Sequence, residues 1–94
     1  DRAGDATVLA AHSRAVEARS RLAAARDGEK SARGWVASAI QADAVGAASA
    51  KDLGDAYIAY FTLRGRVLES IYAWNVAVLT LRRAIGEPII PPGG

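Results

Sequence analysis

Residues 45–53 read VGAASAKDL, and the first half of this stretch is a small, apolar corner between two segments with the composition of long helices. Gly46 can adopt the left-handed conformation that ends a helix. Ser49 and Asp52 have the spacing of a capping box that begins one, with Asp in place of the usual Glu or Gln. The stretch therefore predicts a tight reversal between two helices.

The composition of the whole chain supports helices and limits how they can be stabilised. Alanine is abundant, proline is absent before Pro88, and 94 residues make one small domain at most. There is no cysteine, so disulfides and thiolate metal sites are excluded. Small domains without such links usually rely on self-association or on partner helices, which we expect here.

The charges argue against nucleic acid as a partner, and the hydropathy argues against a helix that spans a membrane. The net charge of +2 comes from interspersed acids and bases without a basic stripe, which disfavours nucleic acid. No apolar run approaches the roughly 18 to 20 residues that span a bilayer. No signal peptide begins the chain, whose first residues suggest a piece cut from a longer protein.

The first helix is predicted over residues 5–44, with Asp5 as its cap. Small and apolar residues recur in steps of three and four along it, which is a heptad seam interrupted by Glu29. The members of this seam are Val8, Ala11, Ala15, Ala18, Leu22, Ala25, Ala32, Val36 and Ala39. The Asp27-Gly28 dipeptide is a turn signal, and a three-helix bundle is the alternative if the helix breaks there. The seam keeps its phase across Gly28, which favours one continuous helix.

The second helix is predicted over residues 49–85. Arg82 and Arg83 lie in its last turn, where the helix dipole favours positive charge. Gly86 is suited to the position after the last helical residue, and Pro88 prevents continuation. Residues 87–94 are expected to form a flexible tail.

The second helix carries two apolar seams rather than one. The first seam is Leu53, Tyr57, Tyr60, Arg64, Val67, Ile71, Trp74, Val78, Leu81 and Ile85. The second seam is Ile58, Phe61, Gly65, Leu68, Tyr72, Asn75 and Leu79. A hairpin can cover only one seam, so two seams call for neighbours on both sides of the helix. We therefore expect an all-α fold: residues 1–94 form a single long antiparallel hairpin of coiled-coil type, packed with other copies.

The expected helix–helix packing residues come from both seams. They are Leu53, Tyr57, Tyr60, Phe61, Leu68, Ile71, Tyr72, Trp74 and Leu81. The aromatic members have helical spacing, so packing explains them better than stacking on a cofactor or on bases.

Catalytic chemistry is not predicted. His12 is the single histidine and is expected to be a solvated surface residue. Asp52 and Asp55 are better explained by the electrostatics of a helix start than by acid–base catalysis. The expectation is a protein that is not an enzyme and has no cofactor-binding or metal site.

Two parts of the chain resemble the TolC-like outer-membrane efflux proteins. The segment YAWNVA at 72–77, followed by LRRAIG at 81–86, resembles the closing helix of that family, in which Tyr-x-Tyr-Asn-x-Ala precedes Leu-x-x-Ala-x-Gly. Trp74 stands where the second Tyr is usual. The corner from Val45 to Ala56 resembles the turn that joins two long periplasmic helices of the family.

The resemblance implies a passive role in transport. Family members are trimers whose long helices form a periplasmic duct that continues into the outer membrane of Gram-negative bacteria. An inner-membrane pump supplies the energy, and the hairpin tips contact the α-hairpin of a periplasmic adaptor protein. The matching tip residues here would be Val45, Gly46, Ala47, Ala48 and Ser49. This chain holds one such hairpin where a full member has two repeats, so the resemblance implies that residues 1–94 are a fragment of a larger α-helical barrel and form part of its wall.

A hypothesis of another class remains beside the duct hairpin. The chain could be a free-standing coiled-coil interaction module without any link to transport. A third, a small helical enzyme subunit, is disfavoured because no site chemistry is recognised.

Overall fold

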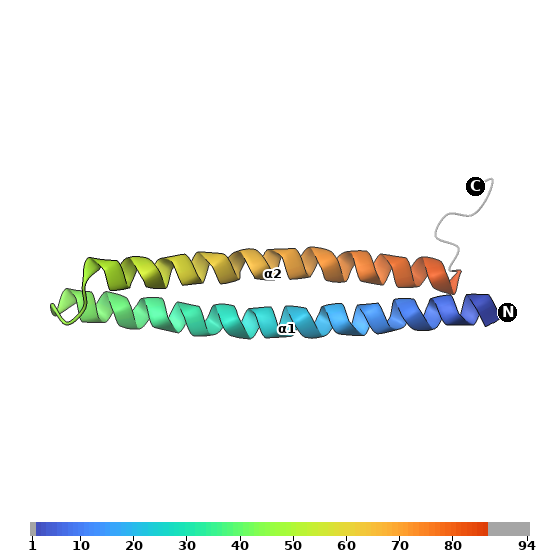
Figure 1. Cartoon of the computed structure of the whole chain (residues 1–94), viewed down its shortest axis with the longest axis horizontal. Coiled ribbons are helices and arrows are strands. Elements are labelled where there is room, and N and C mark those ends of the chain that lie inside the picture. Colours follow the sequence, from blue (N-terminus) through green and yellow to red (C-terminus); the bar gives the residue numbers. More distant parts are fainter. Residues whose placement is uncertain (1, 87–94) are drawn as a thin grey trace.

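The computed structural model describes residues 2–86, which form two long antiparallel helices (Figure 1). Helix α1 spans Arg2–Ala44 and helix α2 spans Ala50–Ile85. The rod is 67 Å long and only 14 Å thick along its shortest axis. The predicted all-α hairpin is confirmed. Helix α1 continues without interruption through Gly28, so the three-helix alternative is wrong.

The corner between the helices has the predicted chemistry. Gly46 has a φ of 74°, and its N–H donates to the carbonyl of Asp43 at 3.1 Å. At the start of α2, the N–H of Asp52 donates to the Ser49 hydroxyl at 3.2 Å, and the N–H of Ser49 donates to the Asp52 carboxylate at 3.1 Å. This reciprocal pair completes a capping box that satisfies two free amides. The last carbonyls of α1 and the first amides of α2 are thus bonded within the turn.

The outer ends of the two helices match the sequence less closely. Helix α1 begins at Arg2, so Asp5 lies inside its first turn and is not the cap. An acid in that turn is still favourable because the helix dipole is positive there. Helix α2 ends as predicted, with Gly86 at a φ of 78° and its N–H directed at the carbonyls of Arg82 and Arg83. The tail expected at 87–94 lies outside the described residues.

The buried side of α1 is the heptad seam read from the sequence. Its buried members are Ala11, Ala15, Ala18, Leu22, Ala32 and Ala39, and Val8, Ala25 and Val36 are half-buried. Glu29 continues the same line and is also buried. Alanine side chains are short, so α2 must approach closely to shield them from water.

The side of α2 that faces α1 keeps seven of the ten predicted first-seam residues buried or half-buried, and the three exposed ones are Tyr57, Arg64 and Ile85. The line of Leu53, Tyr60, Val67, Trp74 and Leu81 is buried or half-buried as expected. The other line of the facing seam is Ala56, Leu63, Ser70, Ala77 and Ala84, one residue before the positions that the sequence suggested. Ala56 is 0% exposed, whereas Tyr57 beside it is 38% exposed and Ile85 is 61% exposed. Helix α2 is therefore rotated toward its small residues.

The rotation has a packing explanation. Two lines of large side chains against an alanine seam would hold the helices apart, whereas one large line and one mostly small line let them close. The register agrees with this, because a Cβ added at Gly28 would lie 3.5 Å from a methyl carbon of Leu63. Gly28 thus lies opposite Leu63 at an ordinary packing distance, inside a continuous helix.

Candidate functional site: the tip and the outer face of α2

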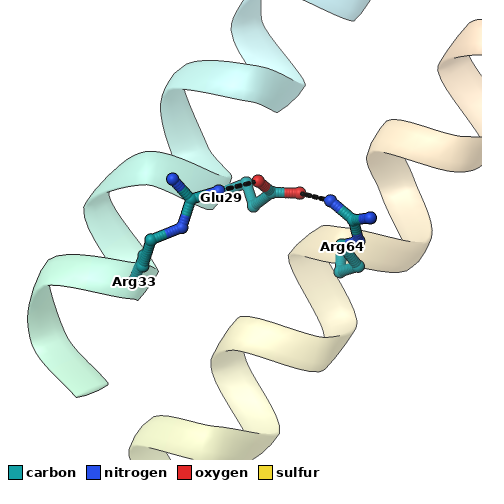
Figure 2. Close-up of polar contacts among 3 residues, drawn as sticks. All are labelled: Glu29, Arg33 and Arg64. Atoms are coloured by element: carbon teal, nitrogen blue, oxygen red, sulfur yellow. Dashed lines mark hydrogen bonds and ion pairs between the residues drawn. The ribbon is translucent and has the colours of Figure 1, made fainter. Parts of the chain in front are cut away.

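One cluster of charged side chains lies between the helices, midway along the rod (Figure 2). Glu29 is the one buried charged residue within the described range. One of its carboxylate oxygens accepts a hydrogen bond from Arg33 in the next turn of α1. The other accepts one from Arg64 of α2 at 3.2 Å. Both guanidinium groups are more than half exposed, so the cluster opens to solvent on one side of the hairpin.

The cluster also links the two helices at one position along the rod, where Arg64 of α2 meets Glu29 of α1. The bond from Arg64 to Glu29 forms only when these two residues face each other, whereas the bond from Arg33 to Glu29 lies within α1 and forms in any alignment. Arg64 appears in the sequence as a polar break in the first seam, and Glu29 as a break in the seam of α1. Their nearly equal distances along the chain from the turn are the signal that they meet.

The predicted tip residues are at the far end of the rod, and most are open to solvent. Val45 is 78% exposed, and Gly46, Ala47 and Ser49 are also exposed, while Ala48 is half-buried. Gly46 has no side chain, and no neighbouring atom lies within 4 Å of the place where a Cβ would stand. The tip thus presents a small, smooth surface with one exposed apolar side chain.

The acidic pair near the tip is accounted for by local contacts. Hydrogen bonding, chiefly by the backbone N–H of Ser49, lowers the pKa of Asp52. Asp55 accepts a hydrogen bond from Lys51 at 2.9 Å, and this contact raises the pKa of Lys51. Both carboxylates therefore have structural partners at the start of α2.

The second seam lies on the outer face of α2, away from α1. Its large side chains are more exposed than buried: Ile58 is 66% exposed, Phe61 63%, Leu68 57% and Tyr72 72%. Phe61 also packs against Tyr57 and Tyr60, with ring centroids 6.3 Å and 5.3 Å apart. The hairpin alone therefore leaves an apolar stripe along most of α2, as the two-seam reading expected.

The expected packing residues thus divide into two groups. Leu53, Tyr60, Ile71, Trp74 and Leu81 are half-buried in the hairpin, and Tyr57, Phe61, Leu68 and Tyr72 are exposed. A stripe of this size on a single helix is unusual for a surface that meets only water.

The described residues offer little for chemistry. His12 is exposed and lines a shallow hollow with Ser13, Val16, Glu17 and Ser20 on the outer side of α1. Among residues 2–86, no three His, Asp or Glu side chains gather closely enough to hold a metal ion. Neither helix in this range has a stretch apolar and long enough to cross a bilayer.

The comparisons with known proteins give no relative. No protein-family model, no curated protein and no solved structure matches this chain. The resemblance described above therefore rests on its own short motifs.

Proposed function

We propose that this chain is a non-catalytic periplasmic hairpin of an outer-membrane efflux duct in a Gram-negative bacterium. Its long sides would form part of the duct wall, and its tip would dock a periplasmic adaptor protein that connects to an inner-membrane pump. In the complete duct, which would be a trimer as in the family it resembles, neighbouring helices would cover the second seam.

The exposed second seam carries this proposal. A helix in the wall of a helical duct has a neighbour on each side, so it needs two apolar faces. Helix α2 has one face against α1 and another, from Ile58 to Leu79, that nothing in the hairpin covers. The motifs at 72–77 and 81–86 lie on this same helix and supply the link to efflux proteins.

The tip supports the docking part of the proposal. Small residues let another backbone approach closely, and apolar contact at the centre of an interface is favourable. Gly46 and the exposed Val45 have these properties. The adaptor surface would have to be similarly small and apolar.

Binding to an adaptor hairpin tests this role. Purified α-hairpins of the periplasmic adaptors from the source organism would be titrated with the chain and its variants by calorimetry. We expect Val45→Asp and Gly46→Asp to abolish binding while circular dichroism shows unchanged helicity. Val45→Asp involves no left-handed backbone, so it separates loss of contact from strain at Gly46. Val16→Asp, on the outer side of α1, is the control that should bind normally.

Unchanged binding by both tip variants would refute the docking role. Absence of binding by the unaltered chain to every adaptor hairpin would favour the second candidate, a coiled-coil interaction module. The observation that favours that candidate is again the second seam, because such a stripe suits any helical partner.

A further inference from the structure

The second seam has no apolar counterpart on the other helix of the hairpin. The large apolar side chains exposed on α1 are Leu9, Val16, Trp35 and Ile40. They fall on three different heptad lines, and charged or small polar residues separate them. The outer face of another α2 therefore offers a better apolar match than any face of α1.

The charges beside the second seam favour one direction of pairing. Asp55 lies near the start of α2 and Arg83 near its end, and a whole number of heptads separates them, so they flank the same side of the seam. Two α2 helices packed antiparallel bring Asp55 of each copy beside Arg83 of the other. In parallel packing, Asp55 and Arg83 of one copy would lie on the opposite edge of the interface from those of the other copy, so neither would have a charged partner across it. Lys51, the present partner of Asp55, is exposed, and a surface pair of this kind is weak enough to rearrange.

We infer that two copies of this hairpin pair through the second seam, antiparallel and about a two-fold axis, to form a flat row of four helices with the two α2 helices at its centre. Heptad packing then brings Leu68 of one copy beside Tyr72 of the other, and Phe61 beside Leu79. Gly65 lies level with Asn75 of the other copy. A Cβ at Gly65 would have no atom within 4 Å, so this position leaves room for the asparagine side chain.

The size of the interface is near the lower limit for a specific complex. At the observed exposures, the five large side chains of the seam present on the order of 500 Å² per copy, or about 1,000 Å² for two. Glu69 lies close to the two-fold axis, so the Glu69 side chains of the two copies face each other. Water and salt weaken their repulsion at this open edge. A reversible dimer is therefore expected. It does not depend on the duct proposal, in which a neighbouring hairpin would cover the same face.

Sedimentation equilibrium of the full chain across a wide concentration range is the first test. We expect the mass to rise from 9.8 kDa to twice that value and no further. Leu68→Glu should weaken the dimer by more than tenfold, and Val16→Glu, an equally exposed apolar site on α1, should leave it unchanged. Both sites face solvent in the hairpin, so circular dichroism should show native helicity for each variant.

Cysteine cross-linking then tests the direction, and the sequence has no cysteine to interfere. Under mild oxidation, Asp55→Cys and Arg83→Cys should form a mixed disulfide with each other when combined, and neither should cross-link when alone. Absence of the mixed disulfide, or self-cross-linking of either single variant, would contradict antiparallel packing and overturn the inference. A monomer at every concentration, an assembly larger than a dimer, or a Leu68→Glu variant that still dimerises would overturn it as well.

Discussion

Replacing the buried carboxylate by a hydrocarbon, as in Glu29→Leu, measures what the charged cluster contributes to stability. Arg33 and Arg64 are more than half exposed, so the two ion pairs together stabilise the fold by only about 1 to 1.5 kcal/mol. The leucine keeps the buried stem of the glutamate and replaces the carboxylate by two carbons, worth about 0.8 kcal/mol each. The carboxylate also loses part of its hydration in the hairpin, and its removal ends that penalty. We therefore expect a free energy of unfolding unchanged or raised by up to about 1 kcal/mol.

The matched control is Glu29→Gln, which keeps the size and loses the charge without gaining apolar contact. It should lower the free energy of unfolding by about 1 kcal/mol. Urea titrations followed by circular dichroism, at one low protein concentration so that association does not contribute, would measure both variants. If both variants are less stable than the parent by several kcal/mol, the ion pairs are much stronger than the exposure of their arginines implies, and the reasoning fails.

Two further predictions concern the facing seam and the capping box. Val67 is 5% exposed, so Val67→Ala should lower the free energy of unfolding by about 2 kcal/mol. Val76 is 43% exposed, so Val76→Ala should change the free energy of unfolding by less than about 0.5 kcal/mol. Equal effects would mean that the orientation of α2 is wrong. The pKa of Asp52 is lowered below its ordinary 3.8 in the folded chain, so its contribution is present above that value and is lost as the pH falls through the folded pKa. Acid titrations should therefore show Asp52→Asn less stable than the parent at neutral pH and the gap closing in acid; a gap that does not change with pH would contradict this.

The fold could be predicted almost completely, because its signals are local. The capping box at Ser49 and the glycines that follow α1 and α2, Gly46 and Gly86, identify helix ends by local chemistry that needs no distant contact. The α1 seam is equally clear, because charged residues on either side of it leave one possible phase. The predicted start at residue 5 misses the observed start at Arg2 by less than one turn, and the ends of a helix are its least defined part.

The orientation of α2 could not be read in the same way. Apolar residues cover more than half of its circumference, so several neighbouring lines look equally suited to a core. The large side chain of Tyr57 looked more suited to a core than Ala56 beside it, yet Ala56 is the buried one. The deciding factor is the alanine surface of α1, which accepts a mostly small line opposite it. That factor belongs to the pair of helices and not to either sequence segment.

The candidate site followed the same division. The exposed tip and the exposed second seam follow from composition and period, whereas the pairing of Glu29 with Arg64 requires the alignment of the two helices. No pattern within one helix indicates which residues of the other helix lie opposite it.

The alanines that line α1 have a consequence for how the rod forms. An alanine has no side-chain torsions to freeze, so packing the helices orders few side-chain torsions on the α1 side, and most of that cost falls on α2. The energy gained per layer is small, but the entropy lost is small too. Such a structure can close from its turn in many modest steps and reopen from its free ends without passing a high barrier.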